Sequence, residues 1–381
     1  MNQCKKILIL IEWFYPGFKA GGPIQSCVNL SLALKSEHDV YVLTTDTDHG
    51  EKEPYPNIIT DKWVIQSDLG ISLFYISRKN YNLKFLGNQI QLVNADIVYL
   101  NLLFSLPFVL YPLWLKYRAK LNATLIVAPR GTLYQSAVSL KAYKKKPLLN
   151  LLRLLGLSNK VIFHATNSRE AAAVSHYFPG SEIVIANNLP SMLQPEFLSL
   201  PKQIGSLKCI FIARIVPIKN LYFLLQLLGC CRMDIDLSIV GPVEDEAYWI
   251  SCSKAIDQLP SNIKVHYLGA KENKEMIPLI QQHHLFILPT QGENFGHTIF
   301  ESLLAARPVL ISDQTPWLDL TDSKAGWSLP LNDSSKFIAV LNQVAGFSQQ
   351  EYDAYAISAW DYADKFIHNP NLKKPYQQLF N

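Results

Sequence analysis

The chain has 381 residues, with 35 Lys and Arg against 31 Asp and Glu, which gives a net charge of +4 with His neutral. Hydrophobic residues make up 49% of the chain and charged residues 17%, which excludes a disordered protein, since disorder needs low hydrophobicity and high charge. A charge of +4 over this length also excludes a general nucleic-acid binder, which carries a concentrated basic face. The length favours two or three domains.

The amino-terminal segment predicts a buried strand rather than a signal peptide. Lys5 and Lys6 precede an apolar run over residues 7–11, but Glu12 interrupts that run before it reaches the length of a signal sequence. The six cysteines form no C-x-x-C pair and have no His cluster at zinc spacing. We therefore expect a cytoplasmic protein in a reducing compartment, without a bound metal.

Short apolar runs rich in Ile and Val alternate with helical patterns along the whole chain. Runs without polar alternation are buried on both faces, which is typical of parallel sheets covered by helices and predicts an α/β fold. The predicted strands are residues 7–11, 40–44, 73–76, 97–100, 124–128, 161–165 and 183–186, then 209–212, 237–240, 265–268, 285–288 and 309–312.

The apolar stretch 97–115 is long enough to cross a membrane, but Asn101, Ser105, Pro107 and Pro112 interrupt it. We interpret it as a buried strand over 96–100, a loop, and a helix that begins near Ser105.

A connector rich in Pro, Leu and Gln, residues 189–205, divides the strands into two sets. We predict two Rossmann-like domains with a cleft between them, at 1–195 and 196–355, and a helical segment at 356–381 that packs back on the first domain. Ligands of such sheets bind outside the carboxyl ends of the strands, so the chemistry should lie in the loops that follow them.

The first candidate site is the loop and helix start over residues 289–301. Glu293 and Glu301 stand eight positions apart, with a Gly-containing loop between them and a helix expected to begin near His297. Free backbone N–H groups at such a start suit oxygen-rich, anionic ligands. The alternative is an ordinary capped helix with two surface acids.

The second candidate site, residues 212–220, follows the first strand of the second set. Arg214 can bind a phosphate through two parallel hydrogen bonds, and Lys219 adds a point charge. The alternative is a solvated basic loop.

Together these segments resemble the family 4 retaining glycosyltransferases, group 1 glycosyl transferases with the GT-B fold. The resemblance includes an E-x7-E motif from Glu293 to Glu301 and an R-x4-K-[GN] segment from Arg214 to Asn220. It further includes Gly241-Pro242, Tyr267-Leu268-Gly269, Arg307-Pro308-Val309, Gly21-Gly22-Pro23 and residues 166–170.

The resemblance implies a role for each matching residue. Arg214 and Lys219 would hold the diphosphate of a nucleotide-sugar, Glu301 the ribose hydroxyls, and Glu293 the hydroxyls of the transferred sugar. Further contacts would come from Asn294, Phe295 and Gly296 through their backbone, from Gly241, Leu268 and Gly269 beside the nucleotide, and from Gly21 and Gly22 in the first domain. The family is usually metal-independent, and the sequence has no D-x-D; we expect no cofactor, and a UDP-sugar rather than a GDP-sugar as donor.

The function implied is transfer of a sugar with retention to a saccharide acceptor, expected to be lipid-linked, in surface polysaccharide synthesis. Two alternatives stay open: a nucleotide-sugar epimerase of the same fold, and a two-domain sugar-binding protein. The chain departs from the family at Arg130, where many relatives have His, and at Arg307, where they often have Gly. His164 fits a structural role, and His297 fits either donor contact or helix capping.

The segment 133–157 interleaves Leu and Tyr with Lys141, Lys144, Lys145, Lys146 and Arg153. A basic amphipathic segment is typical of binding to an anionic membrane surface, here on the inner face of the cell membrane. The alternative is a solvated helical face whose leucines enter the core.

Overall fold

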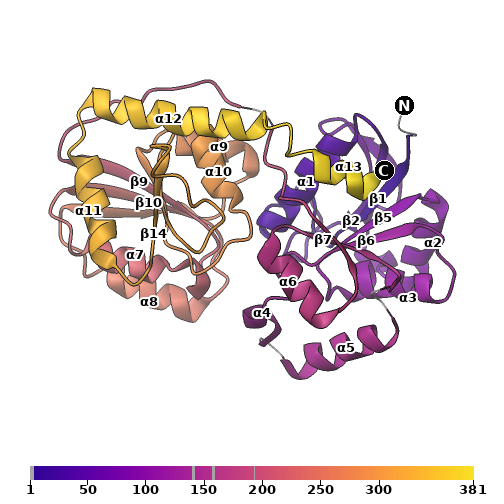
Figure 1. Ribbon diagram of the computed structural model, residues 1–381. Coiled ribbons are helices and arrows are strands. Elements are labelled where there is room, and N and C mark those ends of the chain that lie inside the picture. Colours follow the sequence, from indigo (N-terminus) through magenta and orange to yellow (C-terminus); the bar gives the residue numbers. More distant parts are fainter. Residues whose placement is uncertain (1–3, 140–141, 157–158, 193) are drawn as a thin grey trace. The chain divides into compact units, whose positions relative to one another are not determined.

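The computed structural model describes residues 4–139, 142–156, 159–192 and 194–381. The chain divides into two α/β units: unit 1 comprises 1–189 and 370–381, and unit 2 comprises 190–369 (Figure 1). The boundaries at 189/190 and 369/370 differ from the expected 195/196 and 355/356, and the second difference follows from the packing of one long helix, described below.

Unit 1 is built on a sheet whose strand order, within the described residues, is β3-β4-β2-β1-β5-β6-β7-β8. Neighbouring strands are parallel except β3 and β4. The strands are β1 Lys6–Leu10, β2 Asp39–Thr45, β3 Trp63–Gln66, β4 Ile71–Ile76, β5 Ile97–Asn101, β6 Thr124–Ala128, β7 Ile162–Ala165 and β8 Glu182–Ile185. Continuous burial of β1, β5 and β6 confirms the prediction from their unbroken apolar runs.

The helices of unit 1 cover this sheet and include one that comes from the far end of the chain. They are α1 Gly22–Leu34, α2 Leu83–Val93, α3 Tyr111–Tyr117, α4 Gln135–Ser139, α5 Ala142–Leu154, α6 Ser168–Tyr177 and α13 Lys374–Phe380. Short 3₁₀ and π turns lie at Arg78–Asn80 and Leu106–Leu110. The stretch 97–115 thus forms β5, the π turn and α3, and within the described residues no helix is long and apolar enough to span a bilayer.

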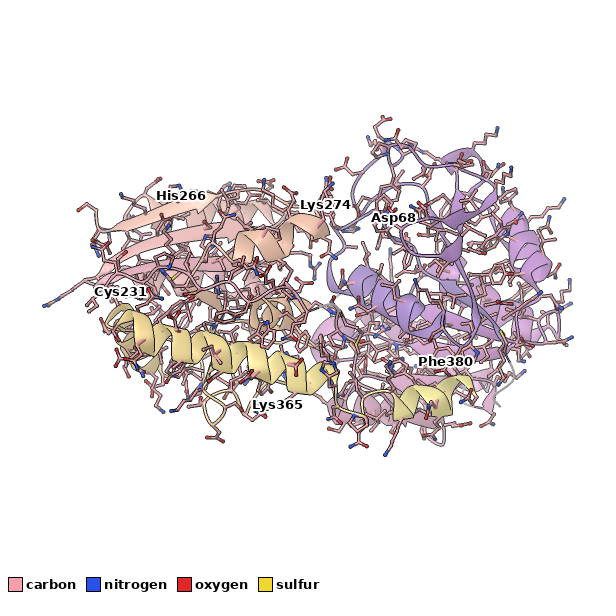
Figure 2. The ribbon with its side chains drawn as sticks, turned by 90° about the horizontal axis from the view of Figure 1, so that it is seen from above. Asp68, Cys231, His266, Lys274, Lys365 and Phe380 are labelled. Carbon is pink, nitrogen blue, oxygen red and sulfur yellow. The ribbon has the colours of Figure 1, made fainter. Side chains whose placement is uncertain are left out.

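The carboxyl-terminal helix α13 closes unit 1. Tyr376 donates a hydrogen bond to the carbonyl of Asn187 at 2.8 Å, and the Phe380 ring lies 5.9 Å from the Tyr99 ring. Figure 2 shows Phe380 on this helix against unit 1, and Lys365 on the long helix that precedes it. Only residues 370–381, rather than the whole of 356–381, belong to unit 1.

Unit 2 has an all-parallel sheet of order β11-β10-β9-β12-β13-β14 within the described residues. The strands are β9 Ser206–Ile212, β10 Asp234–Val240, β11 Ile263–Tyr267, β12 Leu285–Leu288, β13 Val309–Ser312 and β14 Gly326–Leu329. The helices are α7 Leu221–Leu228, α8 Glu246–Ile256, α9 Asn273–Ile280, α10 His297–Leu304, α11 Ser334–Ala345 and α12 Gln349–Ile367, with a 3₁₀ turn at Pro217–Lys219.

Helix α12 belongs to unit 2 because one face of it is buried in that unit's core. Tyr352, Ala356, Ala359 and Ala363 recur at helical spacing and are fully buried there. Their spacing accounts for the boundary at 369/370 in place of the expected 355/356.

Arg307, which the sequence left without a physical explanation, holds the connector against the rest of unit 2. The side chain is 1% exposed and donates to the carbonyls of Leu198 at 2.9 Å, Ala306 at 2.9 Å and Gln281 at 2.6 Å. A guanidinium has five N–H donors in a fixed plane, so it can satisfy several buried carbonyls at once. Arg307 is therefore a structural residue.

Candidate functional site

The loops after β9 and β10 lie so close together that one of them needs a glycine. A Cβ at Gly241 would lie 2.0 Å from the carbonyl oxygen of Ala213, and Gly241 has φ of 141°. No other residue fits this backbone approach. The N–H of Gly241 donates to the carbonyl of Gly269 at 2.9 Å, so the loops after β9, β10 and β11 meet at one edge of the sheet.

Arg214, in the loop after β9, is held by a carboxylate from the loop after β10. Its Nη1 donates to both carboxylate oxygens of Glu244, at 3.2 and 2.8 Å, and the Arg214 side chain is 41% exposed. This contact orients the guanidinium without burying it. Glu244 was not among the predicted site residues, although it stands three positions after Gly241, in a loop that follows a predicted strand.

Lys219 reaches across to the loop after β12 and forms an ion pair with Glu293. Both side chains are mostly buried, at 13% and 16% exposed. The two loops are joined by their backbones as well: the hydroxyl of Thr290 and the N–H of Gln291 donate to the carbonyl of Ile218, at 3.1 and 2.8 Å. The structure thus brings two predicted site residues, Lys219 and Glu293, into direct contact.

Helix α10 begins at His297, as the sequence predicted, because Gly296 before it takes the left-handed conformation with φ of 79°. Phe295 is buried, and its ring lies 5.1 Å from the ring of Trp317. Asn294 lies in the same loop. The Phe295 side chain therefore fixes the backbone of this loop just before α10, whose first N–H groups have no partner within the helix.

Glu301 lies in the second turn of α10 and is buried, with 9% of its surface exposed. Burial raises the pKa of its carboxyl to about 8. Within the described part of the chain, no side chain or backbone group donates a hydrogen bond to this carboxyl. A buried carboxyl in this state can accept hydrogen bonds from the hydroxyl groups of a ligand.

Leu268 and Gly269 follow β11, and the Tyr267 hydroxyl donates to the carbonyl of Gly241 at 2.9 Å. Leu268 is 37% exposed and Gly269 has φ of 70°. An exposed apolar side chain beside open backbone suits contact with a flat base. These residues adjoin the Gly241 turn, at the same edge as Arg214.

Gly21 and Gly22 belong to unit 1. Gly21 has φ of 69° and precedes α1, whose first turn contains Pro23. The loop before it is fixed by Asp48, whose Oδ2 accepts from the N–H groups of Phe18 at 2.9 Å and Lys19 at 3.2 Å.

Arg130 and His164 lie together inside unit 1 and hold structural polar contacts. Arg130 donates to the Tyr99 hydroxyl at 2.9 Å, to Asn101 at 3.3 Å and to Asn188. His164 Nδ1 lies 2.6 Å from the same hydroxyl, and burial together with the charge of Arg130 lowers its pKa to about 3. His164 is therefore a neutral structural residue.

No cluster of three or more metal-binding side chains occurs among the residues that the structure describes.

Comparison with solved structures shows that the whole chain has known relatives in fold. HepE of Anabaena, in complex with UDP and glucose, is 15% identical, with 98% of each chain covered and a TM-score of 0.69. Sucrose-phosphate synthase of Thermosynechococcus elongatus is 13% identical over 99% of this chain and 98% of that one, with a TM-score of 0.69. WaaG, a glycosyltransferase involved in lipopolysaccharide biosynthesis, is 14% identical over 98% of each chain, with a TM-score of 0.64. The chain has the GT-B fold.

The sequence of unit 2 gives a second comparison. Residues 206–346, less than half of the chain, match the family described as Glycosyl transferases group 1. This segment contains Arg214, Lys219, Glu293 and Glu301. No curated protein sequence matches the chain. The family match and the GT-B neighbours together support a group 1 glycosyltransferase.

Proposed function

We propose that the chain is a retaining glycosyltransferase that transfers a sugar from a UDP-sugar to a saccharide acceptor in surface polysaccharide synthesis. One observation carries the proposal: Arg214, Lys219, Glu293 and the buried Glu301 gather at the carboxyl ends of the unit 2 strands, inside the segment that matches group 1 glycosyl transferases. The epimerase and the sugar-binding protein are not favoured, because that match is to transferases.

The two cations are suited to hold a diphosphate. Arg214 is exposed and oriented by Glu244, and Lys219 is oriented by Glu293, so neither side chain must be ordered when the ligand binds. Stabilisation of the leaving diphosphate by such fixed donors would supply most of the catalysis, and the proposal needs no metal. The N-terminus of α10 adds a positive electrostatic potential.

The two carboxyl groups would divide the sugar contacts. Glu301 would accept hydrogen bonds from the ribose hydroxyls, and Glu293, on the loop above α10, from the hydroxyls of the transferred sugar. The acceptor hydroxyl would attack from the face on which the diphosphate departs, and a diphosphate oxygen would take its proton. This front-face route gives retention of configuration.

Donor binding is tested by thermal shift with UDP, GDP and ADP and with their glucose conjugates. A ligand at 100 times its Kd stabilises the folded state by about 2.7 kcal/mol, so the melting temperature should rise by several degrees with UDP and less with GDP. NMR of the product's anomeric proton then reports retention or inversion. A product of inverted configuration, or no shift with any nucleotide, would contradict the proposal.

We also propose that unit 1 binds an anionic membrane surface through α5 and its flanks, where a lipid-linked acceptor would be presented. Leu149 and Leu152 of α5 are buried, while Tyr143, Leu151 and Leu154 are 73%, 51% and 84% exposed. The leucines of α5 therefore enter the core on one face of the helix only, and the other face exposes apolar side chains to solvent. Lys141 and residues 140, 157 and 158 lie outside the described residues.

The exposed cations of α5 determine how strongly the protein should bind an anionic membrane. Lys145 donates to the carbonyl of Ala137 at 2.7 Å and is not counted, which leaves Lys144, Lys146 and Arg153 on α5. Each contributes about 1 kcal/mol near an anionic surface.

Sedimentation with phosphatidylglycerol vesicles tests the membrane proposal. The wild type should sediment at low salt, and the triple variant Lys144→Glu, Lys146→Glu, Arg153→Glu should stay in the supernatant with its UDP binding unchanged. The matched control changes Lys52, Lys62 and Lys79, exposed cations elsewhere on unit 1, to Glu. Equal behaviour of the two triple variants would contradict the proposal.

A further inference from the structure

Unit 1 contains a cavity of about 470 Å³ at the amino ends of its central strands. Strands β1, β5, β6 and β7 are parallel, so they all begin at one edge of the sheet, and the cavity is lined from the start of each strand. Its volume is within the range of about 300–1,000 Å³ that is typical of small-molecule sites. The substrates of open α/β sheets bind at the opposite edge, outside the carboxyl ends. This cavity is therefore separate from the edge where transfer is expected.

The carboxyl-terminal helix α13 supplies one wall of the cavity. Gln378, Leu379 and Asn381 line it, and the Lys5 ammonium group donates to the carbonyl of Asn381 at 2.7 Å, which joins the end of α13 to the start of β1 (Figure 1). Leu379 and Ile97 are 3% and 4% exposed and give the cavity an apolar floor. A ligand bound here contacts both of the separate stretches of chain that make up unit 1.

Polar side chains surround this apolar floor. The amide groups of Asn94, Asn122 and Gln378 make no hydrogen bond to the described part of the chain. Asp96 is fixed beside them, because its Oδ2 accepts from the N–H of Lys6 at 2.8 Å and its own N–H donates to the Lys6 carbonyl at 2.9 Å. Within the described residues, no group donates to its other carboxylate oxygen, Oδ1. Since an amide both donates and accepts, the rim suits a ligand that does the same.

Two helices end at the cavity and add partial negative charge. Asn94, which caps the end of α2 with a left-handed φ of 48°, lines the cavity, and α13 ends against it at Asn381. The last carbonyls of a helix carry partial negative charge, and Asp96 adds a full one. Among the described residues that line the cavity, Lys5 is the single cation, and its ammonium already donates to Asn381. These charges disfavour an anionic ligand.

The remaining ligand classes are separated by their hydrogen-bonding groups. A divalent cation needs several oxygen ligands, and the described residues hold no metal-binding cluster. An organic cation has no use for the donors of the amide rim and is repelled by Lys5. A saccharide offers hydroxyl donors to Asp96, hydroxyl acceptors to the amide N–H groups, and C–H faces to the apolar floor. The chemistry of the cavity therefore fits an uncharged saccharide.

We propose that this cavity binds an uncharged mono- or disaccharide at the amino edge of unit 1, away from the transfer reaction, and that the bound sugar holds α13 on the unit. Asp96 accepts from a ring hydroxyl, and Asn122 and Gln378 bind its neighbours. Because the wall formed by α13 is present only when the helix is docked, the sugar binds the docked form and stabilises it by mass action. The inference does not rest on the proposed glycosyltransferase function.

Two exposed cysteines allow the bound sugar to be located by NMR. Cys4 directly precedes Lys5, and Cys230 lies in unit 2. A nitroxide label on Cys4, in a Cys230→Ser chain, should broaden the proton lines of at least one of methyl glucoside, methyl galactoside, methyl mannoside, maltose and lactose. The same label on Cys230, in a Cys4→Ser chain, should not. Glucose 6-phosphate and methyl glucuronide serve as anionic comparisons and should not be broadened by the Cys4 label.

Three variants test the contacts, each measured by titration of the broadened sugar. Asp96→Asn should weaken its binding about tenfold and Gln378→Ala several-fold, since each removes a hydrogen-bonding partner of the ligand. The matched control is Gln377→Ala, which changes the preceding exposed residue of the same helix, outside the cavity lining. It should bind the sugar as the wild type does. Melting temperatures show that all three variants are folded.

Hydrogen exchange of the peptide 374–380 tests the effect on α13. With the sugar at ten times its Kd, exchange should slow about tenfold in the wild type and in Gln377→Ala. Gln378→Ala at the same sugar concentration controls for the general effect of sugars on stability and should show less protection. Absence of broadening for every neutral sugar, equal binding by Gln378→Ala and Gln377→Ala, equal broadening of the anionic sugars, or unchanged exchange of α13 overturns the inference. These measurements use no nucleotide, so their result is independent of the donor proposal.

Discussion

Replacing the buried Glu301 by Gln should make the protein more stable, and increasingly so as the pH rises. The carboxyl lies in the second turn of α10 without a cation or a hydrogen-bond donor among the described residues, so burial acts on it unopposed. Gln has nearly the same shape and is neutral at every pH. The variant therefore removes the cost of ionising this group and little else.

The magnitude follows from the two pKa values. The folded-state pKa is about 8 and the ordinary value is 4.5. For an acid with a raised folded-state pKa, stability is greatest below 4.5 and falls as the pH rises to about 8, because the unfolded chain loses the proton first. At about 1.4 kcal/mol per pKa unit, the loss is about 3 kcal/mol at pH 7 and about 5 kcal/mol above pH 8.

Urea unfolding at pH 4.5, 7 and 8.5, followed by tryptophan fluorescence, measures the effect. Trp317 stacks on Phe300 of α10 at 5.5 Å and reports on this region. The difference between Glu301→Gln and wild type should grow by about 3 kcal/mol from pH 4.5 to 7, while the exposed control Glu196→Gln should show no such trend. A pH-independent difference would refute the reasoning, because it would mean that Glu301 is ionised at little cost.

The same carboxyl couples UDP binding to pH. If the ribose hydroxyls donate to an ionised Glu301, then at pH 7 binding must first remove a proton from a group with a pKa of about 8. UDP affinity of the wild type should therefore rise about tenfold from pH 7 to 9 and that of Glu301→Gln should not.

Three further changes test the site and its support. Glu301→Ala should weaken nucleotide binding while Glu293→Ala chiefly lowers kcat; wild-type kinetics for both variants would remove the division of roles. Arg214→Ala and Lys219→Ala should each reduce kcat/KM by an amount corresponding to about 2–4 kcal/mol, and EDTA should leave the wild type active; activity lost with EDTA and restored by Mg²⁺ would contradict this assignment. Arg307→Met should lower the free energy of unfolding by about 3 kcal/mol or more, since it leaves buried carbonyls without donors, with unchanged UDP affinity measured by titration.

The elements that the sequence predicted best are those whose burial is continuous. Strands 124–128, 285–288 and 309–312 are found with those bounds, because a run that is apolar on both faces has no other stable place than the middle of a sheet. The short strands β3 and β14 were missed. Strand β3 is only partly buried and pairs antiparallel with β4, so its sequence lacks the continuous apolar run by which the other strands were predicted.

Pairing at the site could not be predicted from spacing. The motif placed Arg214, Lys219, Glu293 and Glu301 in the correct loops and helix. It gave no means to know that Lys219 contacts Glu293, 74 positions away, or that Glu244 holds Arg214. Those contacts depend on how closely the loops approach. Gly241 lies against Ala213 in the pair of loops that carries Arg214 and Glu244, and Ile218 accepts from Thr290 and Gln291 in the pair that carries Lys219 and Glu293.

Unit 1 consists of two separate stretches of chain, and this has a consequence for synthesis on the ribosome. The residues that close it, 370–381, are translated after the whole of unit 2. The Tyr99 ring therefore lacks its contact with Phe380, and the Asn187 carbonyl lacks its hydrogen bond from Tyr376, until unit 2 has been translated. Domains generally fold as units during synthesis, and the amino-terminal domain folds first. In this chain, unit 1 leaves the ribosome first but is completed only after unit 2, because its last residues are 370–381. A nascent chain arrested before residue 370 should present a folded unit 2 beside a unit 1 that still exposes apolar surface to chaperones.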